Sequence, residues 1–76
     1  MKMLLLSDNT DMLLGMRLAG VEGVYIENIH DFPDALQKVI SDKEIAILLI
    51  THNLSRKFED IINPIKMNEQ PLIISI

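Results

Sequence analysis

The sequence predicts an α/β fold: a three-layer, four-stranded parallel sheet with the element order β-α-β-α-β-α-β. Short apolar runs alternate along the chain with amphipathic segments, as strands alternate with crossover helices. The central run, Ile45-Ala46-Ile47-Leu48-Leu49-Ile50, is apolar without alternation, which is typical of a strand covered on both faces of a parallel sheet. With 76 residues, the chain (residues 1–76) is expected to form a single small domain.

The first strand is expected at Met3–Leu6, and an acidic turn, Asp8–Asp11, separates it from the first helix. Thr10 or Asp11 can cap the start of this helix, and Gly20 is suited to the left-handed position at its end. Apolar residues recur through the helix at roughly helical spacing: Met12, Leu13, Met16, Leu18 and Ala19.

The second strand is expected at Val24–Ile26, where residues that favour strands are concentrated. Asp31 is a plausible N-cap for the helix that follows, and Pro33 fits its first turn, where a missing N–H costs nothing. One face of this helix is apolar at the spacing i, i+4, i+7 and i+8: Phe32, Leu36, Val39 and Ile40.

A third helix is expected to begin at Asn53 or Ser55, and Pro64 is expected to end or kink it. Its apolar stripe consists of Leu54, Phe58, Ile61, Ile62 and Ile65. The last strand is expected at Leu72–Ile76.

The predicted strand order in the sheet is 2-1-3-4. Right-handed crossovers then place the first helix on one face and the other two on the opposite face. The face of the third and fourth strands on the first helix's side would lack a cover. We expect a partner, a second copy or a further C-terminal segment to fill it.

Composition favours a binding domain over a nucleic-acid or membrane protein. The apolar fraction is 49%, which is high for so small a domain and favours a docking face. The net charge is −4 and no basic cluster is present, so nucleic-acid binding is not expected. No run approaches the roughly 20 apolar residues of a membrane span, and a cytoplasmic chain is expected. There is no cysteine for a disulfide or a thiolate metal site.

No residue pattern indicates catalysis, and no catalytic, cofactor or metal residue is predicted. The acidic turn Asp8–Asp11 could bind a divalent cation, but its residue types also suit helix capping. His30 and His52, without cysteine, do not form a strong zinc pattern, although either could be a phosphocarrier histidine. The glycines do not form a phosphate or dinucleotide loop.

Gly15 and Arg17 interrupt the first helix. A glycine inside a helix costs about 1 kcal/mol relative to alanine and is usually tolerated because something packs closely against it. For Arg17 the interpretation we favour is an internal ion pair with Asp8, Asp11 or Glu22. The alternative is a docking contact with another protein chain.

A receiver-like or phosphocarrier signalling module is the alternative function, since receiver and Rossmann-like domains share this architecture. Receivers need an acidic pair after the first strand and a phosphorylatable aspartate after the third. Here Asn9 follows Asp8, and the third strand ends in Ile50-Thr51-His52. A phospho-receiver is therefore not favoured.

The chain resembles the F subunit of the V-type and archaeal-type rotary ATPases. That family begins with an apolar strand, an acidic turn and a Gly-Phe-Arg-Leu-Ala-Gly run. The corresponding segments here are Leu4-Leu5-Leu6-Ser7-Asp8 and Gly15-Met16-Arg17-Leu18-Ala19-Gly20, with Met16 in place of the aromatic residue. The run ending in Ile50-Thr51 and the closing segment from Gln70 to Ile76 also match. The family's C-terminal extension and helix, which contact the coiled-coil D subunit of the central stalk, have no counterpart in these residues.

The resemblance implies a non-catalytic rotor component of the central stalk, without a cofactor, that couples ATP hydrolysis or synthesis to H⁺ or Na⁺ transport. Its implied partners are the coiled-coil D subunit, which we call the coiled-coil stalk subunit, and other stalk and head subunits. A homodimer is an alternative for the isolated domain. The chain would lie in the cytoplasm, peripheral to the membrane. The residues expected at the contact are Asp8, Gly15, Arg17, Leu18, Ala19, Gly20 and Thr51.

Overall fold

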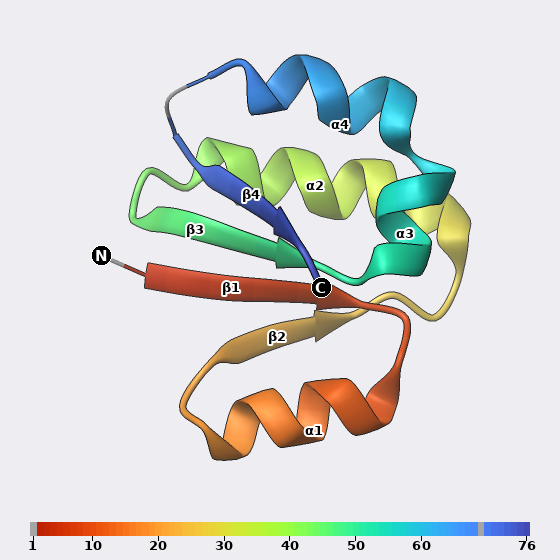
Figure 1. Ribbon diagram of the computed structural model, residues 1–76, viewed down its shortest axis with the longest axis vertical. Coiled ribbons are helices and arrows are strands. Elements are labelled where there is room, and N and C mark those ends of the chain that lie inside the picture. Colours follow the sequence, from red (N-terminus) through yellow and green to blue (C-terminus); the bar gives the residue numbers. More distant parts are fainter. Residues whose placement is uncertain (1, 69) are drawn as a thin grey trace.

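The elements alternate between strands and helices, as the sequence predicts. The computed structural model describes residues 2–68 and 70–76, so Met1 and Glu69 of the predicted single domain lie outside the described residues. The elements are β1 (Lys2–Ser7), α1 (Thr10–Leu18), β2 (Glu22–Tyr25), the 3₁₀ turn η1 (Ile29–Asp31), α2 (Phe32–Ser41), β3 (Ile45–Ile50), α3 (His52–Lys57), α4 (Glu59–Lys66) and β4 (Leu72–Ser75) (Figure 1).

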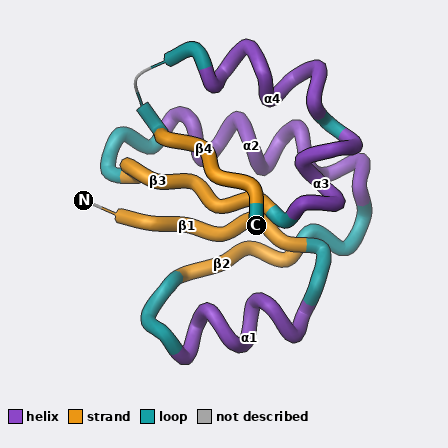
Figure 2. The backbone as a smooth tube through the Cα atoms, viewed as in Figure 1, coloured by secondary structure: helices purple, strands orange, loops and turns teal. Residues whose placement is uncertain are grey.

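The strands form one parallel sheet in the order β2-β1-β3-β4, which confirms the predicted fold class and strand order. Figure 2 shows the four strands side by side, with the helices and loops arranged around them. The helix α1 packs mainly on β2 and β1. In Figure 1 the helix α2 passes behind β4, and no helix lies in front of β3 or β4.

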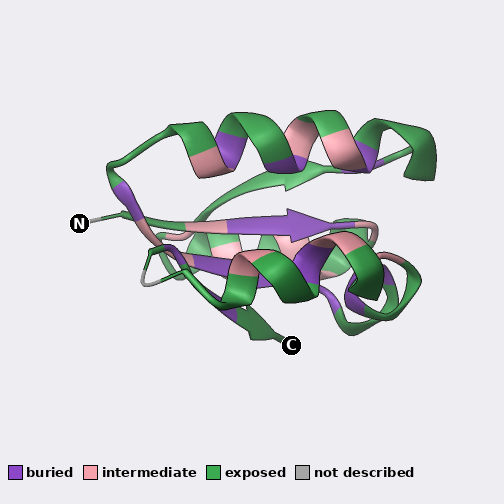
Figure 3. Cartoon of the chain, turned by 90° about the horizontal axis from the view of Figure 1, so that it is seen from above, coloured by how far each residue is buried: buried purple, intermediate pink, exposed green. Residues whose placement is uncertain are grey.

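The core lies between the sheet and the helices α2, α3 and α4. Phe32 is fully buried and stacks on Phe58, with ring centroids 4.5 Å apart and planes inclined by 19°. The other buried residues of this core are aliphatic: Leu6, Ile26, Leu36, Val39, Ile45, Leu48, Ile50, Leu54, Ile62 and Ile73. Figure 3 shows the buried positions gathered at the centre of the sheet and on the sides of the helices that face it. By contrast, α1 contains no buried residue.

The start of α1 differs from the prediction, whereas α2 starts after Asp31 as predicted. The residue that caps α1 is Asn9, whose Oδ1 accepts hydrogen bonds from the N–H groups of Asp11 (2.9 Å) and Met12 (3.1 Å). Asp31 lies at the N-cap position of α2 but makes no side-chain capping bond. Asparagine, like aspartate, accepts such bonds well, so capping propensity alone could not choose among neighbouring residues in the turn.

The third predicted helix is divided into α3 and α4, and the division falls at Phe58. Phe58 has φ −119° and ψ 29°, outside the helical region, so the helix breaks six residues before Pro64. Pro64 lies inside α4, which continues to Lys66; the prediction that it ends or kinks the helix was wrong in position. The start was also wrong, because Thr51 is the N-cap residue of α3.

The sheet face on the side of α1 is left uncovered over β3 and β4, as the topology predicts. The register aligns Met3 with Ile47 and Leu72, and it aligns Leu5 with Leu49 and Ile74. Because side chains alternate along a strand, these rows share one face, opposite the face of the core residues. We call the apolar residues of this face outside the cover of α1 the open face: Met3, Ile47, Leu49, Leu72, Ile74 and Ile76. Four of them are exposed, whereas Ile47 is half-buried and Leu49 is buried between its neighbours.

Candidate functional site

Asp8 and Thr51, two of the predicted contact residues, meet at the carboxyl edge of the sheet. Parallel strands end at the same edge, so the residues that follow β1 and β3 become neighbours. The Thr51 hydroxyl donates a hydrogen bond to Asp8 Oδ1 (3.0 Å), and the side-chain amide of Asn53 donates to Oδ2 (2.8 Å). Thr51 is only 4% exposed. The cluster therefore ties the end of β1 to the start of α3.

These bonds keep Asp8 ionised. The hydrogen bond from Asn53 lowers the pKa of the Asp8 carboxyl below its ordinary value of 3.8. Partial burial acts in the opposite direction, while the Thr51 bond and the positive charge of Lys57 lower the pKa further. Because the folded-state pKa is depressed, the stabilisation is present above the unfolded-state pKa and is lost as pH falls through the folded-state value.

We expect Asp8→Asn to destabilise the domain at pH 7 by about 1 kcal/mol, because an amide replaces an acceptor of two hydrogen bonds. The difference from the wild type should shrink as pH falls below the ordinary carboxyl pKa of 3.8 toward the lower folded-state pKa, because the wild-type carboxyl then becomes protonated as well. Urea unfolding at pH 7, 5 and 3 measures this. Glu27→Gln, an exposed carboxylate in the loop after β2, is the matched control and should show no such trend. A deficit of Asp8→Asn that stays constant down to pH 3 would contradict the assignment.

The other predicted contact residues lie at the C-terminal end of α1. Leu18 is 83% exposed, and Gly15, Arg17, Ala19 and Gly20 are exposed as well. Gly20 has φ 91°, which confirms the predicted left-handed end of the helix, and its N–H donates to the carbonyl of Arg17 (2.9 Å). The chain thus turns sharply and leaves Leu18 in solvent.

Close packing against a glycine occurs at Gly23 and not at Gly15, where the sequence led us to expect it. A Cβ on Gly15 would meet nothing within 4 Å, so the close packing expected there is absent. Close packing occurs instead at Gly23 in β2, where a Cβ would collide with Cδ2 of Leu13 in α1. Gly23 is therefore the position at which α1 approaches the sheet.

The ion pair predicted for Arg17 was also wrong. Across residues 2–68 and 70–76, Arg17 forms no ion pair, and Glu22 pairs instead with Lys2 Nζ (3.8 Å). Arg17 lies beside a shallow hollow of about 350 Å³ that Gly20, Val21, Glu22 and Gly23 complete. Its guanidinium group is therefore free for a contact outside the domain.

The predicted contact residues fall into two groups rather than one. Asp8 and Thr51 lie at the carboxyl edge, where α1 begins, while Gly20 lies where α1 ends. Nine helical residues separate these ends by about 13 Å. Sequence reasoning overlooked Asn53 as a partner of Asp8, and it did not name the exposed residues of the open face. Three of these residues, Leu72, Ile74 and Ile76, recur at every second position in the closing segment, and this spacing is the signal that could have placed them on one face.

Several other chemistries lack the residues they need. Thr51, whose hydroxyl bonds to Asp8, occupies the position where a receiver would carry its phosphorylatable aspartate. Within the described part of the chain, no three histidine, cysteine, aspartate or glutamate side chains cluster as a metal site would require. Among the same residues, no helix is long and apolar enough to cross a membrane.

Together, the fold and its exposed residues define a small α/β domain that presents apolar side chains on two surfaces, the end of α1 and the open face. Exposed apolar patches of this kind are typical of proteins that assemble with others.

Over residues 3–76 the chain matches the family model described as ATP synthase (F/14-kDa) subunit. It therefore belongs to this family, the non-catalytic F subunits of the V-type and A-type rotary ATPases, as the sequence resemblance indicates. No curated protein sequence matches it significantly.

Proposed function

We propose that this chain is a rotor component of the central stalk that binds the coiled-coil stalk subunit. In this role it couples ATP hydrolysis or synthesis in the catalytic head to H⁺ or Na⁺ transport, on the cytoplasmic side of the membrane. Other stalk and head subunits are further partners. A rotor component transmits torque through packed interfaces, so it needs a rigid domain with exposed apolar contacts.

The observation that carries this proposal is the exposure of Leu18. A leucine side chain that is 83% exposed contributes little to the stability of the isolated domain, because little of its apolar surface is removed from water. It lies in the Gly15–Gly20 segment, beside Arg17, which pairs with no carboxylate among the described residues. An exposed apolar side chain beside a free guanidinium group resembles the anchors found at the centres of protein interfaces. Asp8 and Thr51 contribute indirectly, because the hydrogen bond between them stabilises the carboxyl edge of the sheet.

We expect Leu18→Lys to weaken binding to the coiled-coil stalk subunit by at least about tenfold, because a buried apolar contact contributes about 1.4 kcal/mol or more. Lysine near a helix C-terminus does not destabilise the helix, so the fold should persist. Co-expression, size exclusion and calorimetric titration with the coiled-coil stalk subunit measure the loss.

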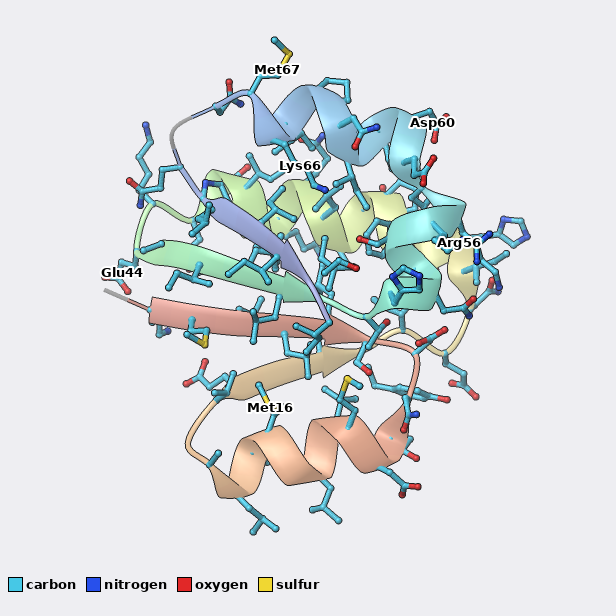
Figure 4. All side chains as sticks on the ribbon, in the orientation of Figure 1. Met16, Glu44, Arg56, Asp60, Lys66 and Met67 are labelled. Carbon is cyan, nitrogen blue, oxygen red and sulfur yellow. The ribbon has the colours of Figure 1, made fainter. Side chains whose placement is uncertain are left out.

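Met67→Lys is the matched control, because Met67 is 87% exposed and points away from the domain at the end of α4 (Figure 4). Binding by Leu18→Lys as tight as that of the Met67→Lys control would remove the α1 end from the interface. Failure of the unmodified chain to bind the coiled-coil stalk subunit would reject the proposed function itself.

A further inference from the structure

The open face is a part of the sheet that no described helix of the domain covers. Leu72 is 57% exposed, and Ile74, Ile76 and Met3 are 40%, 39% and 38% exposed. On the opposite face of the same strand, Ile73 is only 9% exposed. The two faces of β4 thus differ because α2 and α4 cover one of them, whereas α1 does not reach the other (Figure 1).

The open face is bordered by the small-residue side of α1. Thr10, Leu13, Leu14 and Arg17 line a hollow with Gly23 and Tyr25 of β2, so this side of α1 faces the outer edge of the sheet. At 100° per residue, Gly15 and Ala19 lie on the other side of the helix, toward β3 and β4. The empty space around a Cβ on Gly15 agrees with this placement. A neighbouring backbone could therefore approach α1 closely there.

The width of the uncovered region matches one helix. Two neighbouring strands span about 10 Å, and an α-helix with its side chains is about 10–12 Å across. We propose that a single amphipathic α-helix of another protein packs on the open face, beside α1 and against Gly15 and Ala19. The inference rests on the proposed function, which supplies the coiled-coil stalk subunit as the protein that carries this helix.

The charges around the open face specify the helix further. None of its six residues is charged, so the contacting stripe of the helix must be apolar. Asp8, which is held ionised, and the exposed Asp11 lie at the carboxyl edge. A basic residue at the end of the helix near this edge would complement them.

A second copy of this chain fits the face less well. Two open faces meeting directly would use only these six residues on each side, whereas a helix on the face would also contact Gly15 and Ala19 of α1. The helix α1 also stands beside the face and would keep two flat sheets apart. A second copy carries the same negative net charge and the same acidic edge, which makes the approach of like charges unfavourable.

Single cysteines test the proposal cleanly, because the chain has no cysteine of its own. Ile74→Cys lies on the open face. Val24→Cys is its matched control, because Val24 is also a strand residue with 40% exposure but lies on the other face of the sheet, beside Leu6 in the register. Each variant is reacted with a maleimide, alone and with a saturating concentration of the coiled-coil stalk subunit. We expect this partner to slow modification of Ile74→Cys by at least tenfold and to leave Val24→Cys unchanged.

Each outcome decides the proposal. Binding of the coiled-coil stalk subunit with both cysteines equally reactive overturns the helix on the open face and leaves the proposed function standing. No binding of that partner to the cysteine-free chain overturns both. Protection of Ile74→Cys in the chain alone, increasing with its concentration, assigns the face to a second copy and overturns the proposal. Unchanged circular dichroism spectra of both variants confirm that folding is not the cause.

Discussion

Phe32→Ala is expected to remove a large part of the domain's stability at 25 °C. Phe32 is fully buried and stacks on Phe58, so its truncation leaves a cavity and removes the stack. Replacing a buried phenylalanine by alanine costs about 3–5 kcal/mol. A chain of this length has a total stability of roughly 4–11 kcal/mol, so one substitution can remove most of it.

Urea unfolding followed by circular dichroism measures the effect as a lower transition midpoint or a lost folded baseline. Leu14→Ala is the control, because Leu14 is 60% exposed on α1 and alanine suits a helix. Its stability should change by less than about 0.5 kcal/mol. A Phe32→Ala midpoint equal to that of the control would show that the stack with Phe58 contributes little.

The same aromatic pair shows where the sequence was informative and where it was not. The apolar periodicity predicted the helix that carries Phe32 and the apolar stripe that carries Phe58. It could not predict that Phe58 would leave the helical conformation at the point where it stacks on Phe32. That break depends on a contact between segments 26 positions apart, whereas helix periodicity reports only neighbours within a few turns.

The strand order was predictable because it depends on general rules of chain topology and not on any single contact between side chains. The alternation of strands and helices, together with right-handed crossovers, restricts the topology severely. It also indicates an uncovered face, because three helices cannot cover both faces of four strands. Which residues contact a partner does not follow from topology. The structure separates Asp8 and Thr51 from the end of α1, although the sequence resemblance groups them together.

The glycines show the limit of local reasoning most clearly. Gly15 lies inside a helix, where glycine is unfavourable, so the sequence directs attention to it. Gly23 lies in a short strand, where a glycine can reflect either a turn or close packing. Only the structure shows that Leu13 packs against Gly23 and that the space beside Gly15 is empty. Gly23, outside the family's glycine-rich motif, is thus the residue that allows the motif's helix to reach the sheet.

Gly23→Val is therefore expected to displace α1 while leaving the rest of the fold in place. Its side chain would occupy the position of Leu13 Cδ2, close to the carbonyl oxygen of Leu5. Overpacking of this kind costs about 1–3 kcal/mol. Because α1 contains no buried residue, little holds it on the sheet, and local opening is the least costly response. Hydrogen exchange should show lost protection in α1 and retained protection in β3, together with weaker binding to the coiled-coil stalk subunit.

Gly15→Ala is the control with the opposite expected sign. Its Cβ meets nothing, and alanine favours the helix by about 1 kcal/mol, so protection in α1 should increase. If the proposed helix packs against Gly15, this more stable variant should nevertheless bind the coiled-coil stalk subunit less tightly, because the added methyl group lies in the contact. Retained protection of α1 in Gly23→Val would show instead that Leu13 can move aside. The attachment of the helix would then depend on Met12 and Met16, the other half-buried residues of α1. Of these, Met16 points toward the sheet (Figure 4).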